Sequence, residues 1–514
     1  MAQVRVVEVL AALSLTTDIA SGVPLEKGLR TCAVATAFGR ELGLAQDELA
    51  TVFHTALLRA IGCTSHASEN AAQFGDDIAF QAWLKEIDFG DEAALGRQLR
   101  RFAHWAEESK RPALVADFIA TAPTVGPRAN LAACEVGRAL GPRLGLPSAA
   151  VLALDNVYER WDGKGIPGVR AGDDLPIASR IVHLAEQAVL VAAEGGGLEA
   201  VVAEIRHRSG GHLDPDLVTA FAAAPEPALA PLAERDILAA VIAAEPGTVS
   251  MAGDDVVLQM CRALACVVDL KGKYLLGHSD HVATIARTAA RLAGLDSDAQ
   301  NQIETAGLLH DIGRAGVPSS VWDLPGPLTD ADWERVRLHT YWTSRVLERC
   351  PALASLAPLA ASHHEHLDGS GYHRGCRATE LDFTQRLLAA ADALAELTEP
   401  RPERAAMRLP DAAAQLEDHA REGRLDPRAV SAVVEAAGLP RRRPPLPNDL
   451  SEREVDVLRL VARGMTNQQI ADELVLSPRT VGNHLARVYD KIGRRSRAGA
   501  AVFAIEHGLV LGVD

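Results

Sequence analysis

Histidines are concentrated in one part of the chain. Of the 17 histidines among 514 residues, eight lie between residues 278 and 373. They include an adjacent His310–Asp311 pair at the polar edge of an apolar segment and a second adjacent pair, His363–His364. Neighbours on a helix diverge by about 100°, so both members of a pair reach one centre only if it lies across the helix face. Each imidazole could then bind one metal ion, and a carboxylate could bridge two of them.

One acidic residue interrupts an otherwise apolar helical pattern. Asp392 lies within the sequence RLLAAADALAEL. A carboxylate buried without partners is energetically expensive, so we expect a metal ion or another cation beside it. The segments around the histidines, such as HVATIARTAARLAGL and IETAGLLHDIG, also have apolar residues at helical spacing. Packed helices are therefore expected to position these side chains.

The composition agrees with a helical protein. The chain is 48% hydrophobic, 23% charged and only 4% aromatic. Short aliphatic side chains at helical spacing predict an all-α fold, and the length predicts two to four domains. The sequence contains no run of about 18 apolar residues, so we expect no membrane span.

The cysteines and the amino-terminal segment indicate a cytoplasmic location. The seven cysteines form no C-x-x-C motif, and we interpret them as reduced thiols. Glu8 interrupts the first apolar run, and few basic residues precede it, so a signal peptide is not expected.

Charge is unevenly distributed. The net charge is −16, but residues 441–514 carry 12 basic and 9 acidic residues, or +3, which leaves −19 for the remainder. An acidic body with a mildly basic tail suggests that only the tail would bind a polyanion.

Prolines and arginines mark the clearest linker, GLPRRRPPLPN. Its arginines, residues 441–443, fit either a solvated hinge or an additional phosphate contact. A softer boundary lies near residues 222–231. The predicted parts are residues 1–230, residues 231–437, a linker at 438–447 and a final domain at 448–514.

Two passages share the skeleton E-x-x-D-G-x-G: NVYERWDGKGIPGVR from residue 156 and ASHHEHLDGSGYHRG from residue 361. Gly165 and Gly371 are 206 residues apart, whereas ALLRAIG and GLLHDIG align at an offset of 251. The ordered anchors predict a duplication, and the difference of 45 predicts an insertion within about residues 64–130 of the first copy.

Five segments of the second copy resemble, in order, the motifs of the HD-GYP phosphohydrolase family: GHSDHVATIA, LLHDIGRAGVPSSVWDLPGPLT, RLHTYWTSRVL, HHEHLDGSGYH and LAAADALAELTEPRP. The resemblance implies tandem helical HD-like domains, of which the second has seven metal ligands with Asp311 as the bridge. These ligands are His278, His310, Asp311, His339, His363, His364 and Asp392.

The resemblance also implies two divalent metal ions, with iron or manganese favoured by this ligand set. Members with a third metal have an extra glutamate where this chain has Tyr274. Two ions about 4 Å apart would bind a phosphodiester and activate a bridging hydroxide for in-line attack on phosphorus. The family's usual substrate is cyclic di-GMP, and related cyclic dinucleotides are also opened.

Substrate contacts follow from the same resemblance. They are Arg314, which is also a predicted catalytic residue together with Asp311, and Asp368, Gly371 and Tyr372. Two family positions differ, because Leu324 replaces a lysine and His373 replaces the proline of the GYP triplet. The preferred prediction is a transcriptional regulator with phosphodiesterase activity. The alternative is a transcription factor whose HD domain senses nucleotide or metal without turnover.

The first copy resembles the same fold without its ligands. Arg59 and Ala60 replace the His–Asp pair, Val157 and Tyr158 replace the double histidine, and Glu186 replaces the late aspartate. Less securely, Lys27 and Ala133 stand at the first and middle histidine positions. This copy could act as a pseudo-dimer partner of the active copy, or it could sense a ligand in the vacated pocket.

Capping signals divide the final domain into short helices. Ser451 with Glu454 and Thr466 with Gln469 are capping boxes, and Ser477 before a proline predicts a third helix start. The short turn VLS between the second and third helices predicts a helix-turn-helix.

This domain resembles the LuxR-type DNA-binding domain, which implies that the third helix enters the major groove of double-stranded DNA. The implied DNA contacts are Thr466, Asn467, Arg479, Thr480, Asn483, His484, Arg487, Lys491 and Arg497. Arginine and asparagine suit bidentate base contacts. A fourth helix, at about residues 497–507, implies a homodimer on near-palindromic sites.

Overall fold

The computed structural model describes residues 3–85, 87–88, 91–439, 447–462, 465–494 and 496–497, and also residues 500, 503, 504, 507 and 509. The chain divides into two compact units, Met1–Pro440 and Arg441–Asp514. The predicted arginine contacts at residues 441–443 lie outside the described residues. The all-α prediction is confirmed, and the exception is a pair of two-residue antiparallel strands, β1 (Val4–Arg5) and β2 (Met251–Ala252).

The helices of the first half of the larger unit are α1 (Val6–Ala20), α2 (Lys27–Glu41), α3 (Gln46–Leu57), α4 (Ala67–Phe74), α5 (Asp77–Lys85), α6 (Glu92–Leu99), α7 (Arg111–Leu140), α8 (Ser148–Leu154), α9 (Ile177–Ala193), α10 (Leu198–His207), α11 (Pro215–Ala223), α12 (Pro225–Leu229) and α13 (Ile237–Ala244). Short 3-10 helices join them: η1 (Glu108–Lys110), η2 (Pro142–Leu144), η3 (Gly172–Asp174) and η4 (Ala230–Ala233).

The second half contains α14 (Asp254–Asp269), α15 (His278–Leu292), α16 (Ser297–Leu309), α17 (Ser319–Trp322), α18 (Asp330–Arg349), α19 (Ala357–Ala360), α20 (Phe383–Thr398), α21 (Leu409–Arg421) and α22 (Pro427–Ala436). Its 3-10 helices are η5 (Ile312–Gly316), η6 (Ala354–Leu356) and η7 (Ala378–Glu380). Since both halves lie in one compact unit, the predicted division between residues 230 and 231 stays a prediction.

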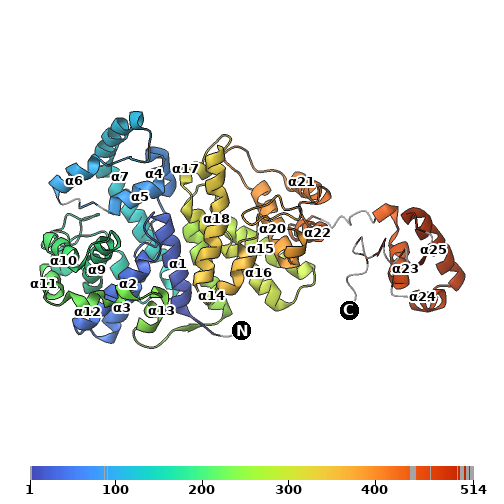
Figure 1. Ribbon diagram of the computed structural model, residues 1–514, viewed down its shortest axis with the longest axis horizontal. Coiled ribbons are helices and arrows are strands. Elements are labelled where there is room, and N and C mark those ends of the chain that lie inside the picture. The colour runs from blue at the N-terminus through green and yellow to red at the C-terminus, as the bar shows by residue number, and fades with distance from the viewer. Residues whose placement is uncertain are drawn as a thin grey trace. The chain divides into compact units, whose positions relative to one another are not determined.

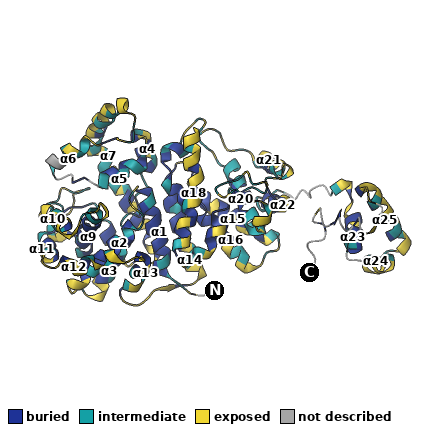
Figure 2. Ribbon diagram, viewed as in Figure 1, coloured by how far each residue is buried: buried dark blue, intermediate teal, exposed yellow. Residues whose placement is uncertain are grey.

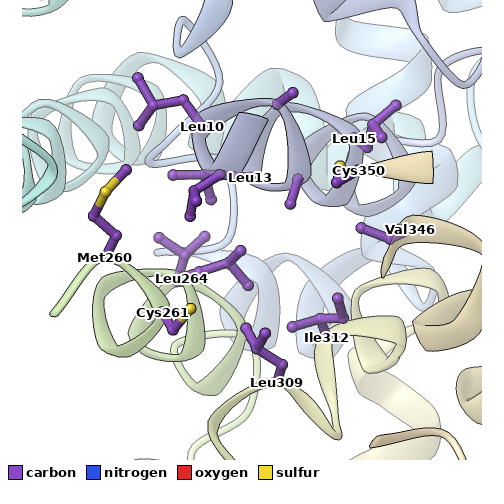
Figure 3. Close-up of a cluster of buried hydrophobic side chains, with 14 of the residues drawn as sticks. Leu10, Leu13, Leu15, Met260, Cys261, Leu264, Leu309, Ile312, Val346 and Cys350 are labelled. Carbon is purple, nitrogen blue, oxygen red and sulfur yellow. The ribbon is translucent and has the colours of Figure 1, made fainter. Parts of the chain in front are cut away.

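Helix α1 lies at the centre of the larger unit and is buried on nearly all sides (Figure 2). A helix that is apolar all round must be covered by protein on every face, and α1 packs against α2, α14, α18 and η5. Figure 3 shows Leu10 and Leu13 of α1 near Leu264 of α14, with Leu309 and Ile312 beyond. The two halves therefore share one hydrophobic core, which fixes their relative position.

Helices α4–α7 lie at one end of the first half (Figure 1), and only the last part of α7 reaches the main core, through Leu140. They enclose a separate cluster of buried side chains that is mostly aromatic: Phe74, Phe80, Trp83, Ile87, Phe102, Ala103 and Phe118. Rings of Phe74 and Phe80 stack with centroids 4.3 Å apart. We call α4–α7 the lid, and it includes the region where the sequence predicts an insertion.

A buried ion pair joins the lid to the second half. Lys271 Nζ donates to Asp77 Oδ2, and both side chains are 1% exposed. Asp77 Oδ1 also accepts from the Ser319 backbone nitrogen at 2.7 Å, and the Ser319 hydroxyl donates to the Lys271 carbonyl at 2.9 Å. These three hydrogen bonds join segments that are distant in sequence.

The smaller unit contains η8 (Pro447–Asp449), α23 (Glu452–Ala462), α24 (Asn467–Leu474) and α25 (Pro478–Ile492). The predicted helix starts are confirmed, since Thr466 and Gln469 form a capping box and Ser477 Oγ accepts from the Thr480 nitrogen at 3.0 Å. Val481, Leu485 and Val488 of α25 are buried in the core of this unit. The predicted fourth helix lies largely outside the described residues.

Candidate metal centre and DNA-binding surface

The seven predicted metal ligands converge at one place in the larger unit. They come from the start of α15, the end of α16 and the turn after it, α18, the segment after α19, and α20. Six are at most 2% exposed, and His364 is half-buried. The seven are His278, His310, Asp311, His339, His363, His364 and Asp392.

Asp311 lies at the centre of this cluster. Its Oδ2 is 3.4 Å from His278 Nε2 and 3.2 Å from His310 Nε2. Its Oδ1 is 3.4 Å from Nε2 of both His339 and His363. The two carboxylate oxygens thus face two separate pairs of imidazoles, as a carboxylate that bridges two cations must.

Backbone carbonyls orient three of the rings. The Nδ1 atoms of His310, His339 and His363 each donate to the carbonyl oxygen three residues earlier, at 2.6, 2.5 and 2.7 Å. A carbonyl can only accept, so Nδ1 carries a proton in each ring and Nε2 is the ring atom that faces the cluster. Metal-binding histidines are commonly oriented by such a contact.

Several buried atoms of the cluster have no hydrogen-bond partner among the described residues. They are Nε2 of His278 and His310, Oδ1 of Asp311, and Oδ1 of Asp392. The Nε2 atoms of His339 and His363 are 3.1 Å apart, although both rings use their proton elsewhere. Unpartnered buried polar atoms are costly, and divalent cations would satisfy all of them. The donor set therefore fits metal binding.

Asp392 completes the cluster from α20. Its Oδ1 lies 3.3 Å from His278 Nε2 and 3.4 Å from His310 Nε2, and its Oδ2 lies 3.7 Å from His364 Nδ1. Burial opposes its ionisation, but the neighbouring His278 and His310 hold the pKa of Asp392 well below its usual value. The carboxyl is therefore an anion that can bind a cation.

Arg314 holds Asp311 in place. Its Nε lies 2.7 Å from Asp311 Oδ2, and its guanidinium lies over the Trp322 ring, 4.8 Å from the centroid. Burial opposes ionisation of Asp311, but Arg314 and His310 keep the pKa of this carboxyl well below its usual value. The observed contacts of Arg314 are thus to the central carboxylate, and its phosphate contact stays a prediction.

The glycine loop brings Tyr372 to the cluster. A Cβ on Gly371 would lie 2.4 Å from the His364 carbonyl oxygen, so only glycine allows the loop to approach the double histidine this closely. The Tyr372 ring centroid is 4.8 Å from that of His364. Asp368 is exposed and accepts from the Ser370 nitrogen at 2.9 Å, so its observed contact shapes the loop.

The corresponding loop of the first half makes the same contacts. Glu365 accepts from two loop nitrogens at 2.8 Å, and Glu159 accepts from two at 3.0 Å. A Cβ on Gly165 would lie 2.5 Å from the Glu159 Cα, as one on Gly371 would lie 2.5 Å from the Glu365 Cα. The shared residues therefore serve the loop conformation in both halves.

Other contacts extend the correspondence. A Cβ on Gly313 would collide with the carbonyl oxygen of His339. A Cβ on Gly62 would lie 2.3 Å from the carbonyl oxygen of Ala133. This equivalence places Ala133 at the middle histidine position. Lys27 Nζ donates to Glu186 Oε1, where the second half has His278 and Asp392. Among the described residues, groups with metal-binding spacing occur in the second half.

The predicted DNA contacts lie around α25. Arg479, Asn483 and Arg487 are exposed on this helix, and Thr480 and His484 are half-buried. Thr466 is exposed at the start of α24, where Asn467 follows it. Two of the residues predicted to contact DNA have side-chain partners within the protein.

These two residues are Lys491 and Arg497. Lys491 Nζ lies 2.8 Å from Glu454 Oε2, and Arg497 donates to Asn467 Oδ1 at 2.8 Å. Both remain exposed, so part of each charge is available to a polyanion.

Two family descriptions match the chain. Residues 262–429 match the HD domain, and residues 448–504 match the luxR family of bacterial regulatory proteins. The chain carries an HD domain and a LuxR-type regulatory domain. In the described residues, no helix is both long and apolar enough to cross a membrane.

Relatives extend the similarity beyond the two domains. The 3'3'-cGAMP-specific phosphodiesterase 3 of Vibrio cholerae is 29% identical over 436 residues, which is 84% of this chain and 94% of the relative. A crystal structure of a cyclic GMP-AMP-specific phosphodiesterase from the same organism, V-cGAP3, has a TM-score of 0.59 at 26% identity and covers 85% of this chain and 99% of its own.

The LuxR-type domain is similar to a different group of proteins. The DNA-binding transcriptional activator DevR/DosR of Mycobacterium tuberculosis is 40% identical over 83 residues, which is 16% of this chain and 38% of the relative.

Two glutamates near the metal centre were not predicted from the sequence. Glu399 accepts from Nδ1 of His278 and of His281, each at 2.8 Å. Glu396 has ligand atoms near His364 and Asp392, within 4.8 Å of one another. Asp392 and Glu396 are four residues apart on one face of α20, and Glu399 follows directly after the end of this helix. The regular spacing of these acidic residues in the sequence is the signal that could have identified the two glutamates.

His373 of the glycine loop, which stands where the family has a proline, contacts a residue that is not a predicted metal ligand. His373 Nδ1 lies 2.9 Å from the Thr340 hydroxyl of α18. Its observed role is to tie the loop to α18. His366 likewise contacts Ser370 within its own loop, at 2.9 Å.

Proposed function

We propose that this chain hydrolyses a cyclic dinucleotide in its HD domain and binds double-stranded DNA through its LuxR-type domain. The observation that carries the enzymatic part is the position of Asp311. Each of its carboxylate oxygens faces a different pair of imidazole Nε2 atoms, at 3.2–3.4 Å. Such a donor arrangement is suited to two divalent cations, and iron or manganese are preferred.

The substrate is a cyclic dinucleotide with 3′–5′ phosphodiester linkages. The relative that aligns with 84% of this chain is named for 3'3'-cGAMP. That alignment spans both halves of the larger unit, so 3'3'-cGAMP stands beside cyclic di-GMP as a substrate to test.

Each ligand group has a proposed role. His278 and His310 would hold one ion, His339, His363 and His364 the other, with Asp311 between them and Asp392 beside the first. When bound, the ions would polarise the phosphodiester and lower the pKa of a water molecule. The protein's own contribution is to hold these donors at fixed orientation and to keep bulk water from them.

Two further residues act around the ions. Arg314 is a positioning residue, because it contacts Asp311 and stacks on Trp322. Burial raises the pKa of Tyr372 well above its usual value, so its hydroxyl stays protonated. It can donate a hydrogen bond to a phosphate oxygen, and it cannot serve as a base near neutral pH.

The decisive experiment is hydrolysis by the full-length chain purified without oxygen, with metal content measured on the same sample. We expect linear dinucleotide or mononucleotide products from 3'3'-cGAMP or cyclic di-GMP, with about two metal ions per chain. Bound metal and bound nucleotide without product, for both substrates, would contradict hydrolysis and favour nucleotide sensing. A chain without metal would contradict the metal centre itself.

The exposed arginines of α25 are proposed to contact bases. Replacing Arg487 by alanine should weaken binding to a duplex selected by the wild-type chain from a random pool by about 1–3 kcal/mol. Fluorescence anisotropy at fixed salt measures the change. Arg453→Ala is the matched control, because Arg453 lies on α23 and donates to the Leu474 carbonyl. Equal affinities of Arg487→Ala and wild type would contradict the proposed interface.

The remaining assignments stay predictions. They are a homodimer, a cytoplasmic location, and regulation of transcription by the nucleotide. The homodimer and the regulation of transcription follow from the LuxR-type similarity, and the cytoplasmic location follows from the cysteines and the amino-terminal segment.

A further inference from the structure

The first half contains a cavity at the place that corresponds to the metal centre of the HD domain. Its volume is about 430 Å³, and its lining includes Arg59, Tyr158 and Glu186. These residues stand at the positions of His310, His364 and Asp392 at the two offsets of the duplication. Pockets for small organic molecules commonly enclose about 300–1,000 Å³.

Three basic side chains lie around Glu186 of this cavity. Glu186 is paired twice, because it accepts from Lys27 Nζ and lies 2.5 Å from Arg59 Nη2. A third cation, Lys85, lines the cavity. Among the residues that the structure describes, Lys85 has no hydrogen-bond or ion-pair partner. One glutamate therefore faces three basic side chains.

Nearby titratable groups strengthen the imbalance. Burial raises the pKa of Asp18 to about 7, so this carboxyl near Lys27 and Lys85 is only partly ionised at neutral pH. Burial and the charge of Lys27 lower the pKa of Lys85 to about 8. Glu159 also lines the cavity, but it is occupied by the nitrogens of Gly168 and Val169.

The lid supplies aromatic side chains to the lining of this cavity. Phe74, Phe80 and Phe118 from α4, α5 and α7 line the cavity. They belong to the aromatic cluster of the lid, which is separate from the main core. The lining thus combines basic groups with aromatic rings, and α5 carries one of each, Lys85 and Phe80.

We propose that this cavity binds an aromatic organic anion, with its acidic group at Lys85 and Arg59 and its ring against the lid phenylalanines. A phosphate or carboxylate would provide the partner that Lys85 lacks, and charge-assisted hydrogen bonds of this kind are among the strong ones. The aromatic rings favour a flat apolar body by offset or edge contacts. The site does not depend on hydrolysis by the HD domain.

A purely structural role predicts a different arrangement. If the first half only supported the active half, an unpaired lysine in a cavity would cost stability without return. Methionine or leucine would fill the space at Lys85 with less cost. The lid would also need no open volume next to its rings.

The probe for the test is anilinonaphthalene sulfonate, a fluorescent aromatic anion, added to the full-length chain. We expect saturable binding, about tenfold or more weaker in Lys85→Gln, because a charged hydrogen bond is lost while the pairs of Glu186 remain. Ala129→Phe, which fills the cavity from α7, should abolish this binding. Lys110→Gln is the matched control, since Lys110 is exposed and paired with Glu107.

Two further arms locate and classify the ligand. Asp311→Asn alters the metal centre and should leave probe binding intact, which separates the cavity from the HD site. Displacement by guanosine monophosphate indicates a nucleotide source of the anion, and displacement by indole-3-acetate indicates an aromatic acid. Hydrogen exchange of residues 77–85 and 111–140 should slow when the probe binds.

The proposal fails on clear results. Probe binding that is equal in wild type, Lys85→Gln and Ala129→Phe would overturn it. So would equally tight binding of neutral naphthylamine in all three proteins, because no anion would then be recognised. Circular dichroism of each variant verifies that the loss of binding does not come from unfolding.

Discussion

Asp311→Asn is expected to lower hydrolysis of the cyclic dinucleotide by about three orders of magnitude or more. Asparagine keeps the size of the side chain but replaces one anionic oxygen by an NH₂ group, which cannot bind a cation. Since each oxygen of Asp311 faces two imidazole Nε2 atoms, both halves of the centre lose a shared ligand. Metal ions supply several kcal/mol of transition-state stabilisation, and about 1.4 kcal/mol is tenfold in rate.

The measurement pairs turnover with metal content. We expect Asp311→Asn to retain less than the wild-type amount of metal after dialysis, with an unchanged helical circular-dichroism spectrum. Asp298→Asn, the same change at an exposed position of α16, should retain both activity and metal. Full metal content and full activity in Asp311→Asn would show that Asp311 does not bridge the ions.

The residues of this centre could be found from the sequence because their signals are local. His310–Asp311 and His363–His364 are adjacent pairs, and Asp392 interrupts an apolar helix within its own segment. The helix starts of the LuxR-type domain could be predicted for the same reason. A capping box depends on two residues three positions apart, whatever the rest of the chain does.

Contacts between distant segments gave no such signal. Residues 6–20 are largely apolar in the sequence, but this composition does not say which helices surround the segment. Its burial against α14 and α18 depends on the tertiary arrangement of both halves. The partner of His278 at Glu399 is likewise 121 residues away.

No local sequence pattern predicts the cavity of the first half either. The sequence predicts an insertion and the loss of the metal ligands, and it leaves both a structural and a sensing role open. Residues of the lid helices line the vacated site, so that Phe118 and Arg59 share one cavity. Short-range patterns therefore identify the reactive groups. The segments that surround these groups come from distant parts of the chain, and no local pattern predicts them.

A second large effect is expected where the lid contacts the second half. Asp77→Ala should lower the free energy of unfolding of the larger unit by about 3–5 kcal/mol, because it leaves Lys271 buried without its anion. Lys271 is 1% exposed, and Asp77 also accepts from the Ser319 nitrogen at 2.7 Å. Both groups lose their compensation in a medium of low polarity. Urea unfolding monitored by circular dichroism measures the change.

The apolar replacement of both partners distinguishes a buried pair from a general packing defect. Asp77→Leu combined with Lys271→Met removes both charges and should recover much of the loss, since apolar pairs of similar volume often substitute well for buried ions. Glu107→Ala, which breaks the exposed pair with Lys110, should cost less than about 1 kcal/mol. If Asp77→Ala cost no more than Glu107→Ala, the pair would not hold the lid. Recovery in the double variant would instead assign the loss to one uncompensated charge, 194 residues from its partner in sequence.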